Sequence, residues 1–305
     1  NLKTTSDTEV LIEAYQRLGL LMFEKFEGMF AGAIYDKAKN CVHLYRDHLG
    51  IKPMYYYSNS KGIMFASEPK VIRANMPERT KINRSQASTF VMFGISDYSS
   101  STFYSGIQQL RPGEVLTVNL NNFTLNKSSF FNLKKQNEPY YSQSPEGYKE
   151  LFLASLNRQL RSDVQVGTSL SGGIDSGLIA TGTGILLGEE AKKVKALTYV
   201  ATGQEYDESV FAQAIAKKAK LDWTPVEFTT ENFQEDFQSL VEYMEEPFGS
   251  LSIFSQFNIM KSANQNGCKV MLDGQGGDEL YLGYPRLAQR IILENLMKGN
   301  IPGMI

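Results

Sequence analysis

The sequence predicts an α+β domain followed by an α/β domain with a mostly parallel sheet. Short apolar stretches split by turn residues fill the first half, whereas the second half alternates strand and helix patterns. A polar stretch of linker composition lies between them, from Lys134 to about Ser144. Two glycine-rich loops follow predicted strands of the second half. We therefore expect two domains, at residues 1–140 and 141–305.

In the first half, a helix precedes the strands. Ser6 and Glu9 have the spacing of a capping box, apolar residues then recur with helical spacing, and Gly19 ends the helix. The clearest strands cover 30–35, 42–45, 54–57 and 63–66, and a later hairpin covers 114–118 and 123–127. Turn residues between the strands favour antiparallel pairing.

In the second half, a helix at 145–160 precedes a strand that ends at Leu170. Further strands are expected at 194–200, 223–228 and 269–272, with helical segments between them. Strands that alternate with helices predict a parallel sheet covered on both faces. In such sheets, ligands bind beyond the carboxyl ends of the strands.

Composition narrows the class of protein. The chain has 305 residues, of which 42% are hydrophobic and 21% charged, and a net charge of −2, which favours neither nucleic acid nor an anionic membrane as partner. No apolar run has the length of a membrane span, and no signal-peptide pattern opens the chain. Cys41 and Cys268 alone exclude a disulfide framework and a cysteine zinc site. Both resemble ordinary strand residues, and a reducing cytoplasm is the expected location.

The first glycine-rich loop joins a strand end to a helix start. Glycines at 172 and 173 let the main chain approach a phosphate, and the hydroxyls of Ser171 and Ser176 add donors at the helix N-terminus. The alternative is a flexible turn that happens to contain glycine. The loop lacks the lysine of a Walker A sequence. Its order, Ser-Gly-Gly-x-Asp-Ser, resembles the pyrophosphate loop of the ATP pyrophosphatases.

The second loop, at 273–279, again places glycines and an acid between a strand and a helix. Mg²⁺ takes oxygen ligands, usually one or two carboxylates together with substrate phosphates. Asp175 and Asp278 each follow glycines at a strand end and could form that pair. Alternatively, Asp278 is a helix cap. The presence of both loops in one domain favours a joint nucleotide and magnesium site.

Together the two loops resemble those of the glutamine-hydrolysing asparagine synthetase family. The later loop is similar to the family's Gly-x-Gly-x-Asp-Glu followed by Gly-Tyr, here at 274–279 and 283–284. In the first half, the segments at 26–31, 46–53 and 65–68 are similar to the family's class II glutamine amidotransferase domain. These matches run from Ser6 to Pro285 in the family's order.

The resemblance implies an N-terminal glutaminase of the N-terminal-nucleophile type with partial αββα layers, followed by a synthetase domain of the ATP-pyrophosphatase type. It implies ATP and Mg²⁺, and amidation of a carboxylate through an acyl-adenylate. Aspartate would become asparagine, with release of AMP and pyrophosphate. Two alternatives stay open, namely another carboxylate, such as a sugar acid or a peptide side chain, and a non-catalytic relative with a binding role. Expected partners are glutamine, ATP and the acceptor, with a second copy in a homodimer, and neither nucleic acid nor membrane.

The resemblance also implies roles for individual residues. Asp7 matches the acid that binds the α-amino group of glutamine, and Asp175 with Asp278 matches the magnesium carboxylates. The positions that contact ATP and its pyrophosphate are Ser169, Leu170, Ser171, Gly172, Gly173, Ser176, Asp273 and Gly274. Gln275 stands where typical members carry a catalytic Glu, and an amide cannot exchange a proton near neutral pH. The acceptor could therefore differ from free aspartate.

Two family features are expected to lie outside this chain. The family nucleophile is a Cys at the very N-terminus, where this sequence has Asn1, and the family's catalytic Lys would follow Ile305. We therefore interpret the sequence as the central part of a longer synthetase, with residues 1–140 and 141–305 as parts of its two domains. A polypeptide limited to these residues is expected to be inactive.

Overall fold

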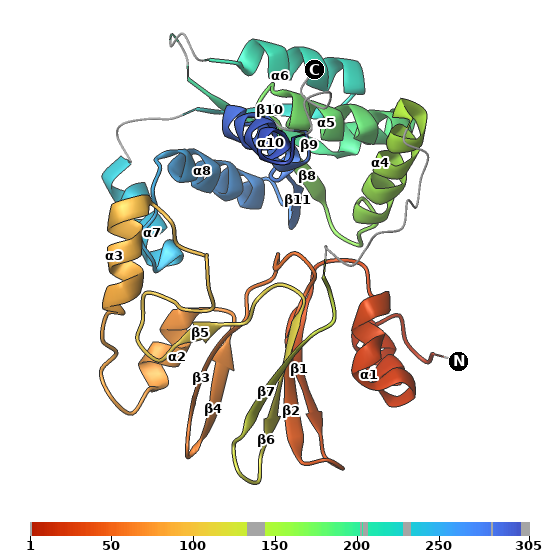
Figure 1. Ribbon diagram of the computed structural model, residues 1–305. Helices are drawn as coiled ribbons and strands as arrows, with labels where there is room; N and C mark the ends of the chain where they lie inside the picture. Colours follow the sequence, from red (N-terminus) through yellow and green to blue (C-terminus); the bar gives the residue numbers. More distant parts are fainter. Residues whose placement is uncertain are drawn as a thin grey trace. The chain divides into compact units, whose positions relative to one another are not determined.

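A computed structural model describes residues 2–132, 144–201, 203, 207–227, 233–281 and 283–299 (Figure 1). The chain forms two compact units. The first unit is Asn1–Glu138 together with Glu245–Gly249, and the second is Pro139–Met244 together with Ser250–Ile305. The predicted linker lies almost wholly at 133–143, outside the described residues, so the domain boundary at 140 stays a prediction.

The first unit contains two antiparallel sheets, with strand orders β1-β2-β6-β7 and β4-β3-β5. Its elements are α1 (Asp7–Leu18), the 3-10 helix η1 (Gly19–Lys25), β1 (Ala31–Asp36), β2 (Cys41–Arg46), β3 (Tyr55–Asn59), β4 (Gly62–Ala66), α2 (Pro69–Asn75), α3 (Arg84–Phe93), β5 (Gln108–Gln109), β6 (Glu114–Asn119) and β7 (Leu125–Ser129). The three predicted hairpins, β1 with β2, β3 with β4 and β6 with β7, are confirmed.

Side chains alternate along β2 and build two cores on its opposite faces. Leu44 packs with Tyr56 of β3, in the second sheet, and with Met54, which directly precedes that strand. Its neighbour Tyr45 packs with Met22 of η1 and with apolar residues of α1. Because α2 packs on β3 and β4, the layers run helix, sheet, sheet, helix. This confirms the predicted αββα arrangement.

The predicted capping box of α1 is only half correct. Ser6 is the N-cap, and its hydroxyl accepts a hydrogen bond from the Thr8 N–H at 3.3 Å. The Glu9 carboxylate does not return to Ser6; it accepts from the backbone N–H groups of Lys3 at 2.8 Å and Thr4 at 2.6 Å. These bonds fold the segment before the helix onto the first turn, a contact that the Ser-x-x-Glu spacing alone does not reveal.

The turn after β2 depends on one buried carboxylate, Asp47, which is 1% exposed. Its oxygens accept hydrogen bonds from the backbone N–H groups of Ile51 and Lys52, each at 2.9 Å, and from those of Leu49 at 3.1 Å and Phe30 at 3.3 Å. A buried carboxylate is tolerated only when its lone pairs are satisfied in this way. Asp47 thereby fixes the path of the chain between the two sheets.

The second unit has one four-stranded sheet, with order β10-β9-β8-β11, in which every pair of neighbours is parallel. Its elements are α4 (Pro145–Gln159), β8 (Val166–Ser169), α5 (Ile174–Leu187), the 3-10 helix η3 (Gly188–Lys193), β9 (Lys195–Val200), α6 (Ser209–Ala219), β10 (Asp222–Glu227), α7 (Phe233–Met244), α8 (Ser252–Gln265), β11 (Val270–Leu272), α9 (Gly277–Tyr281) and α10 (Pro285–Met297). The predicted parallel sheet is confirmed.

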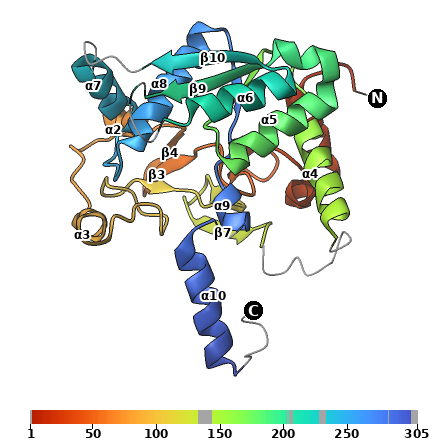
Figure 2. The same cartoon turned by 90° about the horizontal axis from the view of Figure 1, so that it is seen from above.

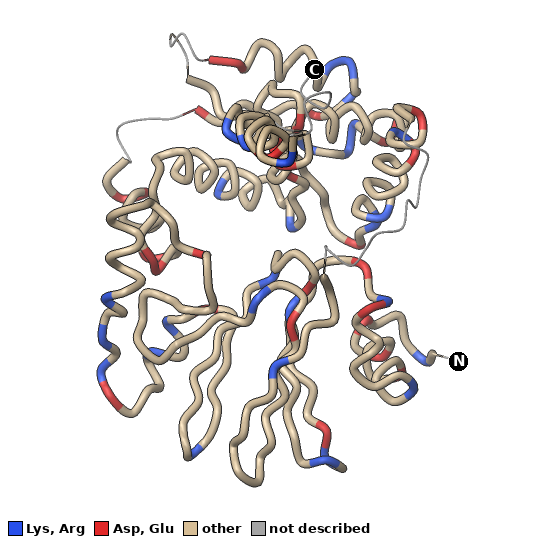
Figure 3. Tube along the Cα trace, viewed as in Figure 1, with Lys and Arg blue, Asp and Glu red and all other residues tan. Residues whose placement is uncertain are grey.

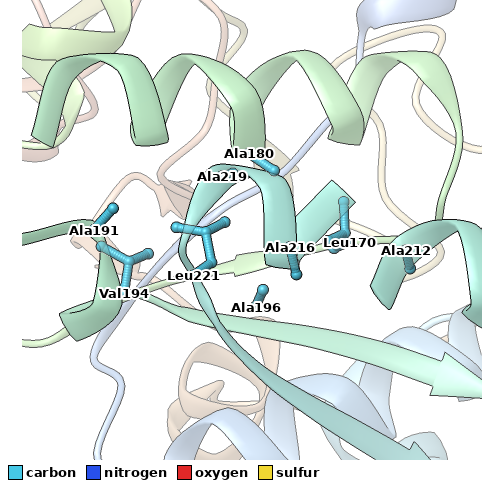
Figure 4. Close-up of a cluster of buried hydrophobic side chains, with 9 residues drawn as sticks. All are labelled: Leu170, Ala180, Ala191, Val194, Ala196, Ala212, Ala216, Ala219 and Leu221. Atoms are coloured by element: carbon cyan, nitrogen blue, oxygen red, sulfur yellow. The ribbon is translucent and has the colours of Figure 1, made fainter. Parts of the chain in front are cut away.

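Helices cover both faces of this sheet. Ala196 of β9 lies in a cluster with Ala180 of α5 and Ala216 of α6 (Figure 4). The next residue, Leu197, faces the other way and packs on Ala263 of α8. Small side chains in the first cluster allow α5 and α6 to approach the strands closely. The result is a three-layer unit whose strands end at the same edge.

The described surface is mixed in charge, and Lys and Arg are interspersed with Asp and Glu in each unit (Figure 3). In the second unit, α10 extends away from the sheet and has no buried residue (Figure 2). Among the described helices, none combines the length and the apolar character needed to cross a bilayer.

We expect Asp47→Asn to destabilise the first unit by about 2–3 kcal/mol. The amide NH2 group would face backbone N–H groups that now donate to a carboxylate oxygen, so these donors would lose their acceptor. Glu24→Gln is the matched control, since Glu24 is exposed, and it should change stability by less than about 0.5 kcal/mol. Thermal unfolding followed by circular dichroism measures both. Equal stability of the two variants would contradict the role given to Asp47.

Candidate active site

A pocket of about 710 Å³ opens at the carboxyl ends of the parallel strands. Its wall includes residues near the ends of β8 and β9 and the loops that follow β8, β9 and β11. Of the residues predicted for nucleotide, metal or catalysis in the second unit, all except Gly172 line it, namely Ser169, Leu170, Ser171, Gly173, Asp175, Ser176, Asp273, Gly274, Gln275 and Asp278. Two loops separated by about a hundred residues are thus brought to one site.

The loop after β8 requires glycine at position 172. Gly172 has φ +93°, a conformation that residues with a side chain rarely adopt. A Cβ atom there would also lie 2.8 Å from the carbonyl oxygen of Glu208. The loop therefore packs tightly on the start of α6 while its other side faces the pocket.

The two serines of this loop bond to each other and to the loop backbone. Ser171 Oγ and Ser176 Oγ are 3.0 Å apart, and the Gly173 N–H donates to Ser171 Oγ at 3.2 Å. Helix α5 begins directly after Gly173, its N-cap, which makes no side-chain capping bond. N–H groups of the first helical turn have no intrahelical acceptor, so this end of α5 favours an anion. Donors and helix dipole thus meet at the pocket wall.

Ser169 supplies a buried polar atom that is not satisfied. Its Oγ is inaccessible to solvent and has no hydrogen-bond partner among the described residues. Burying a hydroxyl without a partner costs about 1–3 kcal/mol. Because Ser169 lines the pocket, a bound ligand could supply the partner.

The second loop packs directly on the first. A Cβ atom at Gly274 would lie 2.9 Å from the Ser176 N atom, and one at Gly277 would overlap the carboxylate of Asp175. Strands β8 and β11 are paired, and Thr168 Oγ1 donates to the Leu272 carbonyl oxygen at 3.0 Å just before the two loops begin. Glycine at 274 and 277 therefore makes room for Asp175 and Ser176.

Acidic side chains gather where the loops meet. Asp175 and Asp278 both line the pocket, and neither forms an ion pair with a basic residue in the described part of the chain. The carboxylates of Glu279, Asp278 and Asp175 raise the pKa of the nearby Tyr284 hydroxyl. Carboxylates without a basic partner, beside the backbone N–H groups at the start of α5, fit the oxygen ligands that Mg²⁺ prefers. A cation would balance the two charges.

The alternative role of Asp278 as a helix cap is wrong. Asp278 lies inside the first turn of α9, which starts at Gly277. Its backbone carbonyl accepts from the Gly283 N–H at 2.9 Å, and its side chain lies against Gly283. Contacts with Gly283 therefore fix both the backbone and the side chain of Asp278, and its carboxylate lines the pocket.

Sequence reasoning missed the third strand-end loop. Asp207 and Glu208 line the pocket after β9 and before α6. Asp207 Oδ1 accepts from the Ser209 N–H at 3.0 Å, and hydrogen bonds from Ser209 lower the pKa of Asp207. The missed signal was an Asp-Glu pair between a predicted strand and a helix, without the adjacent glycines that marked the other two loops. Gln275 is exposed at the wall, and Asp273 Oδ2 accepts from Gln256 Nε2 at 3.0 Å.

Asp7, the predicted ligand of glutamine, belongs to the first unit. It is the first residue of α1 and is exposed. An acid in the first turn is favoured by the helix dipole. The bonds of Glu9 to Lys3 and Thr4 hold the chain just before it.

Comparison with known proteins assigns both halves. Residues 1–131 match the family model described as a glutamine amidotransferase domain, and residues 147–302 match the family model described as asparagine synthase. Similar proteins include the glutamine-hydrolyzing asparagine synthetase 2 of Bacillus subtilis strain 168, which is 32% identical over 302 residues covering 92% of this chain and 40% of the relative. A putative glutamine-hydrolyzing asparagine synthetase 2 of Methanocaldococcus jannaschii is 31% identical over 290 residues, covering 92% and 54%. The chain spans about half the length of these curated relatives.

One solved structure that aligns with part of this chain is the NH3-dependent NAD synthetase from Campylobacter jejuni. It aligns with a TM-score of 0.33 and 19% sequence identity, over 47% of this chain and 62% of that chain.

Comparing two glycine variants tests the loop geometry. Gly172 and Gly276 have nearly the same φ, +93° and +90°, but only a Cβ at position 172 would meet a neighbouring atom. Each change to Ala should cost about 1–2 kcal/mol for backbone strain, and Gly172→Ala about 1–3 kcal/mol more for overpacking. Urea unfolding followed by the fluorescence of Trp223, the only Trp of the chain, measures both. Equal losses would show that the contact with Glu208 is not tight.

Proposed function

The chain belongs to the asparagine synthase family, and from that premise we propose that it contributes to the ATP-dependent amidation of a carboxylate with nitrogen from glutamine. One observation carries this proposal: the two glycine-rich loops touch at Asp175 and enclose a pocket lined by Asp175 and Asp278. The pocket has the size of a small-molecule site. Its wall combines backbone donors for phosphate with carboxylates for a cation.

Different residues of the pocket would bind the pyrophosphate, the nucleoside and the magnesium ion of ATP. The backbone of Gly172 and Gly173, with the hydroxyls of Ser171 and Ser176, would hold the pyrophosphate at the N-terminus of α5. Ser169 Oγ, buried without a partner among the described residues, would form a hydrogen bond with the nucleotide. Leu170, Asp273 and Gly274 would make further contacts with the nucleotide. Asp175 and Asp278 would hold Mg²⁺, which when bound supplies positive charge against the phosphates.

The proposed reaction has two steps. A carboxylate oxygen of the acceptor attacks the α-phosphorus of ATP, and the bond to the β-phosphate oxygen breaks, so pyrophosphate leaves and an acyl-adenylate remains. Ammonia then attacks the acyl carbon, AMP leaves with the electrons of the acyl–oxygen bond, and the nitrogen loses a proton. Donors at the pyrophosphate loop favour the first step because they bind charge that grows on the leaving group.

Glutamine would supply the ammonia in the amidotransferase domain. We propose that the exposed carboxylate of Asp7 binds the α-amino group of glutamine, as the resemblance implies. Binding at that end orients the side-chain amide for hydrolysis. Hydrolysis itself would use the nucleophile of the complete enzyme.

Aspartate is the proposed acceptor, and asparagine the product. Gln275 lies in the pocket wall, where it can hydrogen-bond a substrate but cannot act as an acid or base. Because of that chemistry, a second candidate acceptor is a sugar acid or a peptide side chain, which would undergo the same two steps. A purely binding role is disfavoured because both carboxylates and the phosphate loop are in place. We further propose that the enzyme works in the cytoplasm as a homodimer, and the free thiols of Cys41 and Cys268 are consistent with a reducing compartment.

Asp278→Ala in the intact enzyme should reduce ATP–pyrophosphate exchange to background and leave glutamine hydrolysis largely unchanged, because only the nucleotide site loses a ligand. Glu279→Ala is the matched control, since this neighbouring acid is exposed and does not line the pocket. It should retain exchange. Parallel loss of exchange and hydrolysis in Asp278→Ala would indicate damage to the fold instead of loss of a cation site.

Aspartate should stimulate ATP–pyrophosphate exchange more than other carboxylates do. Gln275→Ala should weaken that stimulation by about tenfold or less, the effect of one uncharged hydrogen bond, without changing the KM for ATP. Exchange assays across aspartate, sugar acids and carboxylate-bearing peptides measure this. Stimulation by another carboxylate and none by aspartate would replace the acceptor and keep the proposed chemistry.

A further inference from the structure

Away from the pocket, the first unit contains a compact set of metal-binding side chains that the proposed function does not use. One ligand atom each from Asp36, Cys41 and His43 lies within 4.8 Å of the others. Cys41 is 5% exposed and His43 is 4% exposed, and the side chain of Asp36 is 11% exposed. We propose that these three residues bind one divalent transition-metal ion, with Zn²⁺ as the best fit.

The β1–β2 hairpin builds the cluster through its register. Asp36, the last residue of β1, pairs directly with Cys41, the first residue of β2. Cys41 and His43 are two residues apart in a strand, so their side chains share a face, the one on which Tyr45 packs toward α1. Three different ligands therefore project to one side of two adjacent strands.

Two neighbours hold the ligands in place. Thr117 of β6, the partner of His43 in the sheet, has its Oγ1 2.8 Å from His43 Nδ1. This bond leaves Nε2 on the side of Cys41 Sγ, 3.4 Å away, and of the Tyr15 hydroxyl, 2.9 Å away, a contact that a bound ion would replace. Tyr15 of α1 donates to Asp36 Oδ2 at 2.7 Å. Hydrogen bonds from the far nitrogen of a histidine ligand and to a carboxylate ligand are the usual supports of a metal site.

The separation of the ligand atoms suits a tetrahedral ion. Zn²⁺ binds sulfur at about 2.3 Å and imidazole nitrogen at about 2.0–2.1 Å, which places the two atoms about 3.6 Å apart in a tetrahedron. The observed distance between Cys41 Sγ and His43 Nε2 is 3.4 Å. A thiolate with an imidazole favours Zn²⁺ over Mg²⁺ or Ca²⁺, which prefer oxygen. The cluster thus has a different cation preference from the pair Asp175 and Asp278.

An ion could reach the cluster from outside. A cavity of about 630 Å³ lies between α1 and β1 and is lined by Tyr15, Asp36 and Lys39, among others. The Lys39 ammonium lies 3.2 Å from Asp36 Oδ2, and its side chain is 68% exposed. Lys39 can therefore balance Asp36 when no metal is bound and move into solvent when one binds.

A nucleophilic cysteine is the competing interpretation of the same residues. In a Cys–His pair that performs such chemistry, the histidine is oriented by an acceptor at its other nitrogen. Here Asp36 lies on the Nε2 side of the ring, bridged to it by the Tyr15 hydroxyl, instead of at Nδ1. These contacts favour ligation over attack.

The ion would join α1 to the β1–β2 hairpin, because Tyr15 reaches the cluster from the helix. The same helix begins at Asp7. Two cysteines exclude a site made of several thiolates, as the sequence indicates, but the hairpin shows a mixed set that needs only one. Its spacing, Asp-x4-Cys-x-His, is meaningful only once the turn and register are known.

Cobalt titration of the metal-free intact protein tests the proposal. Co²⁺ bound by a thiolate produces an intense charge-transfer band in the near ultraviolet, whereas Co²⁺ at Asp175 and Asp278 has no sulfur ligand and produces none. We expect one Co²⁺ per chain with this band, displaced by Zn²⁺. The band should be absent in Cys41→Ser and retained in Cys268→Ser. Cys268 is the matched control because it is the other free thiol and is also 5% exposed.

A second variant and a measurement on the unaltered protein distinguish loss of the metal site from misfolding. Thr117→Val keeps all three ligands but removes the bond to His43 Nδ1, so it should weaken Co²⁺ binding about 10–100-fold. In the unaltered protein, Zn²⁺ should slow alkylation of Cys41 but not of Cys268. No charge-transfer band in the unaltered protein, a band that persists in Cys41→Ser, or equal alkylation of both thiols with and without Zn²⁺ would overturn the proposal.

Discussion

The pairing of β8 with β11 is the constraint on which the candidate active site depends. These strands are about a hundred residues apart in sequence, yet they are parallel neighbours, so both end at the same edge of the sheet. The hydrogen bond from Thr168 to the Leu272 carbonyl fixes their relative position just before the loops begin. The contacts between the two glycine-rich loops follow from that alignment, because it brings Gly274 and Gly277 against Asp175 and Ser176.

The loops then fit together because glycine occupies the positions where they touch. A side chain at Gly277 would occupy the space of the Asp175 carboxylate, and one at Gly172 would meet the backbone at Glu208. Glycine loses more conformational entropy on folding than any other residue. A site with several glycines therefore needs support from regular structure. For the first loop, the alanine-rich packing of α5 and α6 on the strands provides it, since α5 begins directly after Gly173.

Much of the fold could be predicted because its signals are local. Short apolar runs split by turn residues identified the strands, and glycine with acid after an apolar run identified both loops around Asp175 and Asp278. Contacts that depend on strand register, or on a segment that folds back onto an earlier part of the chain, could not be predicted. Glu9 bonds backward to Lys3 and Thr4, and the segment Glu245–Gly249 joins the first unit although it follows α7. The third loop was visible in principle, but Asp207 carries no glycine signal.

The two proposed cation sites differ in which groups balance their acidic charge when no ion is bound. At the hairpin, Asp36 already accepts hydrogen bonds from Tyr15 and from the Lys39 N–H, and the Lys39 ammonium neutralises it. The first unit can therefore fold before a metal arrives, unlike small domains that depend on zinc. At the strand ends, Asp175 and Asp278 have no basic partner among the described residues, so like charges accumulate. Such a site gains most from a cation that arrives with its phosphates, because two opposite charges are then introduced together.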